Sequence, residues 1–269
     1  MDYRLLAAVF GLPLLAVGAT EVPRFLSPKQ FWGQLVYRVP PVEPANVVAL
    51  TFDDGPWGDS TRKVLSILKE HDVKATFFLV GKHLLMYPDL TAEIVKAGHA
   101  VGNHSWSHTY QPVEPAIAKQ EIENTSALIA KQSTAQTRLF RPPGGHLETG
   151  LVAYAKSKNY AIIMWSVDPH DSKPETTAAE IVQRTLKGVR PGSIILLHDG
   201  GGDRAVTRAA LPTLIRRLKA QGYHFVTVPE LLQLGIEAPL PPPQPTVPPE
   251  LIPTVPPEPP LEPTETLPR

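Results

Sequence analysis

The 269-residue chain contains no cysteine. Disulfide bonds and thiolate metal sites are thereby excluded, so any zinc site would have to use histidine and carboxylate ligands. An excess of charge of one sign is also missing, because 26 basic side chains balance 26 acidic ones. We therefore expect no nucleic-acid partner and no attraction to an anionic membrane surface.

Long apolar runs are scarce as well. The segment from Leu5 to Val17 is apolar, but it is shorter than the ~20 residues that a membrane-spanning helix needs. It follows Arg4 and ends at the small residues Gly18 and Ala19, which is the pattern of a secretory signal. We predict that residues 1–19 are a signal peptide or, alternatively, an N-terminal anchor; a buried helix is the third interpretation. Export would make the protein secreted, periplasmic or part of the cell envelope.

Proline, in contrast, is abundant, with 31 residues that are concentrated after Ala238. A segment of proline with interspersed Glu and Thr is typical of an extended chain without a core. We predict that residues 238–269 are a disordered tail that acts as a spacer or threads a wall. Recognition by a proline-binding module is the weaker alternative.

Strands and helices alternate between these two ends, where the 42% hydrophobic content supports one sizeable core. Residues 20–45 are interpreted as a linker or an N-terminal extension, and residues 46–237 as one domain. Apolar runs predict strands at 47–52, 75–80, 99–102, 137–140, 161–167, 193–198 and 224–228, and periodic patterns predict helices at 60–70, 89–96, 115–131, 149–157, 176–187 and 205–220. This alternation predicts an α/β fold with a parallel sheet.

Two adjacent carboxylates, Asp53 and Asp54, follow the first predicted strand of this domain. Like charges in a strand-end pocket repel each other and lose hydration unless a cation lies beside them. The alternative is an ordinary Asp-Asp-Gly-Pro turn.

His104 and His108 follow another predicted strand, and two imidazoles four residues apart share one face of a helical turn. Two histidines and one aspartate with an open fourth position form a catalytic zinc site, in which the metal activates water.

Chemically useful side chains follow further strands. Arg141 begins the turn Arg141–Gly145, where it can hold Asp53 and where a glycine amide can donate to an oxyanion. His198 follows a fully apolar strand and is a candidate general acid. Asp168 and Asp171 end the preceding strand, and either of them could orient His198. Because at least five strands carry such motifs, we expect a barrel with its active site at the C-terminal strand ends.

In their order and residue pattern, the motifs at 51–56, 104–108, 141–145, 164–171 and 194–199 resemble those of the polysaccharide deacetylases of carbohydrate esterase family 4. This metal-dependent group removes acetyl from N-acetylated, and in some members O-acetylated, sugars. The resemblance spans residues 47–232. It implies a distorted, incomplete (β/α) barrel of about seven parallel strands and makes residues 46–237 the catalytic domain.

The resemblance also implies roles for individual residues. Asp53 resembles the catalytic base, and Asp54, His104 and His108 resemble the metal ligands. Arg141 would pair with Asp53, the Gly144 amide would bind the oxyanion, and His198 would be the general acid, tuned by Asp171. Leu196 would line the acetyl pocket, and Pro143 and Trp165 would contact the substrate. The family often has Tyr at the position of Gly144 and Trp at the position of Ser172, so the wall that contacts the sugar is expected to be thinner here.

These assignments lead to one preferred function and two alternatives. We expect hydrolysis of the acetamide of N-acetylglucosamine in peptidoglycan or a chitin-like polysaccharide, with Zn²⁺ as the metal and Co²⁺ or Ni²⁺ as alternatives. The alternatives are an O-acetyl esterase that acts on acetyl-xylan and a non-catalytic sugar-binding module. The intact set of charged motif residues argues against the last. The protein is expected to be a monomer and to touch a membrane only through an N-terminal anchor.

Overall fold

The computed structural model describes residues 24–25, 28–43 and 45–235. The chain divides into two units, residues 1–238 and 239–269, and all described residues belong to the first. The predicted signal peptide or anchor at 1–19 and the whole predicted proline-rich tail at 238–269 therefore lie outside the described residues. Within the described part of the chain, no helix is long and apolar enough to cross a membrane.

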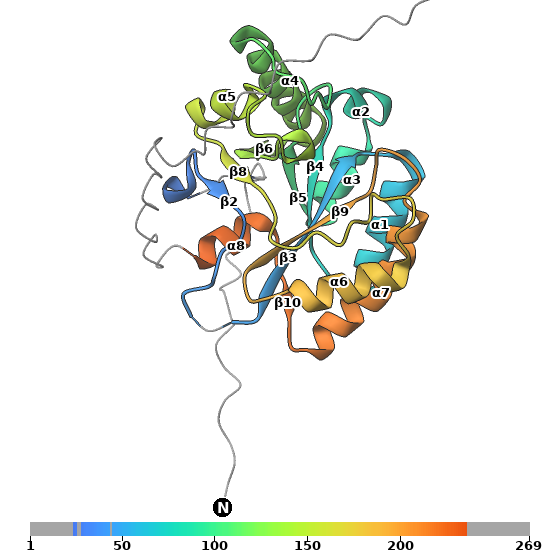
Figure 1. Ribbon diagram of the computed structural model, residues 1–269. Helices are drawn as coiled ribbons and strands as arrows, with labels where there is room; N and C mark the ends of the chain where they lie inside the picture. The colour runs from blue at the N-terminus through green and yellow to red at the C-terminus, as the bar shows by residue number, and fades with distance from the viewer. Residues whose placement is uncertain (1–23, 26–27, 44, 236–269) are drawn as a thin grey trace, which may run out of the picture. The chain divides into compact units, whose positions relative to one another are not determined.

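A curved parallel sheet of eight strands forms the centre of the first unit (Figure 1). Its strands follow the order β10-β3-β4-β5-β7-β8-β2, with β9 on the other side of β3. Their bounds are β2 Leu35–Val36, β3 Val47–Gly55, β4 Thr76–Leu79, β5 Ala100–Asn103, β7 Leu139–Phe140, β8 Ala161–Ile163, β9 Ser193–His198 and β10 His224–Phe225. A separate pair consists of β1 Arg24–Phe25 and β6 Gln136–Thr137.

The curved sheet partly closes on itself. Beyond the end of β8, Val167 forms an isolated parallel bridge to Ile195 of β9, and Arg38 forms an antiparallel bridge to Ser193 at the start of β9. These bridges join the two ends of the strand order without a full ladder between them. The expected incomplete (β/α) barrel is confirmed.

Helices surround the sheet (Figure 1). They are α1 Gly58–Glu70, α2 Gly81–Met86, α3 Leu90–Lys96, α4 Pro115–Ser133, α5 Leu151–Ser157, α6 Ala178–Gly188, α7 Ala205–Ala220 and α8 Val228–Leu234, with short 3₁₀ turns at Lys29–Phe31 and Pro143–Gly145. Thr177 and Glu180 form a capping box at the start of α6, which satisfies backbone N–H groups that a helix leaves free. Thr227 and Glu230 repeat the arrangement at α8.

Most predicted elements agree in type and order with the structure, although the strand expected at 161–167 ends at Ile163. The strand expected at 137–140 is divided into β6 and β7, and the short helices α2 and α8 were not predicted. The segment 20–45, expected to be a linker, contains β2, which pairs with β8 through Leu35–Ile162 and Val36–Ile163. This part of the segment therefore belongs to the sheet, because the buried Val36 and Phe31 pack into the core beneath it.

Strand register brings the polar strand ends together. Asp53 of β3 lies beside His198 of β9, and Asn103 of β5 lies beside Phe140 of β7. Parallel strands end at the same edge of a sheet, so residues that follow β3, β5, β7, β8 and β9 meet there. The apolar residues of the strands, among them the fully buried Leu50, Phe77 and Ile195, pack against the surrounding helices and hold this edge in place.

Candidate active site

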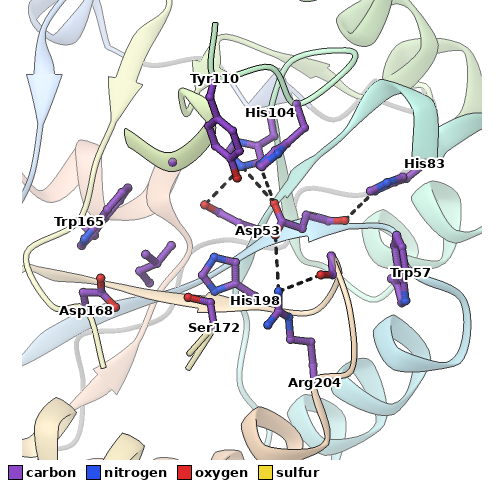
Figure 2. Close-up of a pocket in the computed structure, with 15 residues that line it drawn as sticks. Asp53, Trp57, His83, His104, Tyr110, Trp165, Asp168, Ser172, His198 and Arg204 are labelled. Atoms are coloured by element: carbon purple, nitrogen blue, oxygen red, sulfur yellow. Dashed lines mark hydrogen bonds and ion pairs between the residues drawn. The ribbon is translucent and has the colours of Figure 1, made fainter. Parts of the chain in front are cut away.

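A pocket of about 540 Å³ opens at the C-terminal edge of the sheet. Figure 2 shows Asp53 and His198 near the middle of the pocket, with Trp165 and Trp57 at opposite ends. The lining residues are Asp53, Asp54, Trp57, His83, His104, His108, Tyr110, Gly144, Trp165, Asp168, Ser172, Leu196, His198, Gly201 and Arg204. Most of the residues that the sequence singles out are therefore brought to one cavity.

Asp53 is held from below by Arg141. The guanidinium Nη1 of Arg141 donates to Asp53 Oδ1 at 2.7 Å and to Thr51 Oγ1 at 2.8 Å. Its remaining nitrogens donate to the carbonyl oxygens of Ile163 and Met164 at 2.9 and 3.0 Å. Burial lowers the pKa of Arg141, whereas the neighbouring carboxylate of Asp53 raises it. The ion pair fixes one oxygen of Asp53 and leaves Oδ2 directed toward His104, 3.7 Å from its Nε2.

Asp54 points into the pocket because the strand is irregular at this residue. The pairing of β3 with β4 shifts register between Phe52 and Gly55, and Asp54 has a φ of 70°. This bulge turns two successive carboxylates toward the same side, whereas a regular strand would alternate them. The strand accordingly continues to Gly55 and does not end before the two aspartates.

Asp54, His104 and His108 form a cluster whose ligand atoms all lie within 4.8 Å of one another. Asp54 Oδ1 is 3.0 Å from His108 Nε2 and 3.5 Å from His104 Nε2, yet it accepts no hydrogen bond. His104 Nδ1 donates to the carbonyl oxygen of Arg141 at 2.7 Å, so its Nε2 presents a lone pair to Asp54.

This donor set fits a divalent cation. Two imidazole lone pairs and a buried carboxylate oxygen face the same point, and a cation there would satisfy all three. Burial alone raises the pKa of Asp54, but His104 and His108 lower it well below its usual range. These contacts favour the ionised form of Asp54, which is the form that binds a metal.

The two histidines converge through a loop, so the expected helical turn is wrong. Residues 104–110 adopt no helix, and Ser105 and His108 have φ values of 65° and 58°. The buried carboxylate of Glu121 on α4 accepts from the N–H groups of Trp106 and Ser107, each at 2.8 Å, and from the Ser107 hydroxyl at 2.7 Å. Glu121 therefore holds residues 104–110, the candidate metal-ligand loop, in shape. This role depends on the packing of α4.

Asp171, and not Asp168, contacts His198. Its Oδ1 lies 2.7 Å from His198 Nδ1, and its Oδ2 accepts from the His198 N–H at 2.9 Å and from the Thr207 hydroxyl at 2.8 Å. Burial lowers the pKa of His198, but the hydrogen bond and charge of Asp171 raise it to about 9. His198 is therefore an imidazolium at neutral pH, with Nε2 free to donate a proton. Asp168 lines the pocket and pairs with His170 at 3.2 Å.

The predicted substrate contacts divide into two groups. Gly144, Leu196 and Trp165 line the pocket, and Gly144 adopts the left-handed conformation with a φ of 59°. Pro143 is buried and does not line it, so this residue supports the turn from within. Arg141 and Asp171 likewise lie behind the residues that they orient.

Five pocket residues were not predicted from the sequence: Tyr110, Trp57, His83, Gly201 and Arg204. His83 Nδ1 lies 2.8 Å from the carbonyl oxygen of Asp54, and its ring packs edge-on against Trp57. The guanidinium of Arg204 is 3.9 Å from Asp54 Oδ2. No strand-end motif marks these residues, because loops and helix starts bring them to the site.

Comparisons with known proteins agree with this geometry. A family model described as polysaccharide deacetylase matches residues 42–163. A Bacillus cereus protein named peptidoglycan-N-acetylglucosamine deacetylase is 37% identical over 207 residues, which cover 75% of this chain and 94% of that protein.

Two solved structures have the same fold. The crystal structure of the Bc1960 peptidoglycan N-acetylglucosamine deacetylase superposes with a TM-score of 0.70 at 35% identity, covering 74% of this chain and 92% of that one. A family 4 acetyl xylan esterase from Clostridium thermocellum, in complex with a cobalt ion, gives a TM-score of 0.64 at 37% identity, covering 70% of this chain and 91% of that one.

Proposed function

Because the chain belongs to the polysaccharide deacetylase family, we propose that it hydrolyses the acetamide of N-acetylglucosamine residues in peptidoglycan. The observation that carries this proposal is the pair of successive carboxylates with different surroundings. Asp54 faces two imidazole lone pairs, whereas Asp53 is ion-paired with a buried guanidinium. One carboxylate suits a metal ligand and the other suits a proton acceptor.

Asp54, His104 and His108 would hold the divalent cation, with Zn²⁺ as the first candidate and Co²⁺ or Ni²⁺ as alternatives. When bound, such an ion supplies Lewis-acid polarisation of a carbonyl group and lowers the pKa of water. The chain's own residues bind the sugar, orient the acetamide and move protons.

Asp53 is the general base in this proposal. It accepts a proton from the water that attacks the acetamide carbonyl carbon, through the oxygen that Arg141 leaves free. Arg141 fixes the carboxylate in place. The N–H of Gly144 donates to the oxyanion of the tetrahedral intermediate.

His198 completes the reaction as the general acid. Its Nε2–H gives a proton to the departing nitrogen, the C–N bond breaks, and acetate and a free amine result. Asp171 holds the imidazolium in the required tautomer and orientation through Nδ1. Leu196 lines the pocket, where an apolar side chain suits the methyl group of the acetyl.

The proposal is tested by measuring the acetate that purified protein releases from N-acetylglucosamine oligomers, from peptidoglycan and from acetyl-xylan, with and without a chelator. We expect release from the first two substrates and its loss with chelator. Release from acetyl-xylan alone would replace the proposed substrate by an O-acetyl ester. No release from any of them would favour a sugar-binding protein.

The proposed substrate also suits export. The apolar segment at 5–17 and the proline-rich residues 238–269 fit an enzyme that is secreted or held in the cell envelope, where peptidoglycan lies. The same division assigns residues 46–237 to the catalytic domain. A fusion of residues 1–25 to a reporter tests export, because an exported reporter is expected and a cytoplasmic one would contradict it.

A further inference from the structure

Tyr110 stands beside the metal-ligand loop with much of its ring exposed. The side chain follows His108 by two residues and lines the pocket. In Figure 2 it reaches toward Asp53 from the side opposite His198. It is 51% exposed, so about half of its surface is available to a ligand that enters the pocket.

Two histidine rings hold Tyr110 in place. Its ring packs edge-on against His108 at a centroid distance of 5.1 Å and against His146 at 5.4 Å, with interplanar angles of 78° and 66°. These contacts fix the ring before any ligand arrives. A ligand that packs against it therefore does not have to order a mobile side chain.

The turn below Tyr110 is made of two glycines, and both are required by aromatic neighbours. A Cβ at Gly144 would lie 2.8 Å from Tyr110 Cε1, and a Cβ at Gly145 would lie 2.8 Å from Trp165 Cη2. Real Cβ atoms essentially never approach another atom so closely. The absence of side chains at 144 and 145 therefore lets Tyr110 and Trp165 approach the same turn from two sides.

We propose that Tyr110 is a substrate-binding residue whose ring forms, with Trp165, an aromatic clamp for the sugar that carries the acetamide. The inference rests on the proposed function, because it names a contact made by that substrate. The apolar C–H face of a pyranose would cover the exposed face of the Tyr110 ring, and the acetamide would then lie over the Gly144 turn. The ring replaces the wall that a side chain at position 144 would otherwise provide.

The phenol has a secondary part in this arrangement. Removing the hydroxyl alone leaves the apolar ring and both histidine contacts in place. Ring packing therefore predicts a small effect for Tyr110→Phe and a large effect for Tyr110→Ala.

The test compares Tyr110→Phe, Tyr110→Ala and the control Tyr37→Ala in the full-length, zinc-loaded protein. Tyr37 is 46% exposed and does not line the pocket, so it matches Tyr110 in size and exposure. Three quantities are measured: binding of N-acetylglucosamine trimer by calorimetry, KM and kcat for acetate release from that trimer, and zinc per protein.

We expect Tyr110→Ala to weaken trimer binding and raise KM about tenfold, or about 1.4 kcal/mol, with kcat changed less and zinc retained. Tyr110→Phe and Tyr37→Ala should stay within about twofold of the parent. Unchanged binding and KM in Tyr110→Ala would overturn the clamp. So would a loss of zinc and kcat with unchanged trimer affinity, because Tyr110 would then only position His108. If the parent binds trimer through Tyr110 but releases no acetate, the clamp stands and the proposed reaction is wrong.

Discussion

Single residues in this site do different work according to the groups that surround them. Asp53 and Asp54 are neighbours in sequence, yet the first meets Arg141 and the second meets two imidazoles. His104 and His198 both use Nδ1 for a structural hydrogen bond, the first to a carbonyl and the second to a carboxylate. The neutral partner suits a metal ligand, and the charged partner suits a proton donor.

The charge of Asp171 sets the pH range over which His198 can act. With its pKa raised to about 9, His198 carries its proton at neutral pH. Because the folded pKa exceeds the ordinary value of 6.5, the pair stabilises the fold fully below that value. This stabilisation is lost as the pH rises through about 9.

Asp171→Asn is therefore expected to move the alkaline limb of the pH–rate profile to lower pH, because it removes the main interaction that raises the pKa of His198 against the effect of burial. The rate at pH 8 should fall by about tenfold or more. The profile of acetate release between pH 5 and 10 measures this change. Asp168→Asn serves as the control, since it alters a pocket carboxylate that does not touch His198. An equal shift of the alkaline limb in both variants would contradict the role assigned to Asp171.

At the scale of elements, the loop between β5 and α4 decides whether the metal ligands converge. Its backbone takes left-handed conformations at Ser105 and His108, which cost energy for residues with side chains. Three hydrogen bonds to Glu121 offset that cost. The metal site thus depends on a helix that contributes no ligand.

Glu121→Ala should lower both zinc affinity and stability, because two partly buried N–H donors lose their partner. We expect a loss of about 2 kcal/mol or more in the free energy of unfolding and at least a tenfold weaker affinity for zinc. Equilibrium dialysis and thermal unfolding measure the two effects. Glu121→Gln keeps the shape and one acceptor oxygen and should be milder; wild-type zinc affinity in Glu121→Ala would show that the loop holds its shape without the glutamate.

The elements that the sequence predicted are those with a strong local signal. Apolar runs bounded by turns located β3, β4 and β9, and the polar residues that follow them marked the edge of the sheet. The helix α2 and the strand β2 were not predicted, because short elements gain their stability from packing rather than from their own sequence. The bulge at Asp54 and the loop at 104–110 were also missed, since neither follows a helix or strand period.

The same reasoning explains which site residues could be predicted. Asp53, His104, Arg141 and His198 each follow an apolar strand, and parallel strands collect such residues at one edge. Tyr110 and Glu121 reach the site only through loop conformation and helix packing. Their discovery required the structure.

At the scale of the whole molecule, helix α8 packs the C-terminal end of the described chain into the core. The last helix, α8, buries Val228, Leu231 and Leu232 in the core. Leu234 and Gly235 are fastened to the N-terminal part of the unit by hydrogen bonds from Val42 and Gln30. Residues up to 235 thus supply these contacts between α8 and the rest of the described unit.

Deletion of residues 238–269 is accordingly expected to leave the melting temperature within about 2 °C and the turnover of a short N-acetylglucosamine oligomer within about twofold. The matched control ends the chain before Val228, which removes three buried side chains and should abolish cooperative unfolding. Calorimetry and acetate release measure both chains. A large loss of turnover after the shorter deletion would place part of the active site in the proline-rich segment.

The proposed mechanism depends most on the different roles of Asp53 and Asp54, and zinc content distinguishes these roles directly. Asp53→Asn and Asp54→Asn are loaded with zinc, dialysed, and assayed for zinc per protein by mass spectrometry and for acetate release. We predict that Asp53→Asn keeps its zinc but loses about a hundredfold or more in turnover, because an amide cannot accept the proton of water. Asp54→Asn should lose zinc and turnover together. Equal loss of zinc in the two variants, or full zinc in Asp54→Asn, would contradict the account.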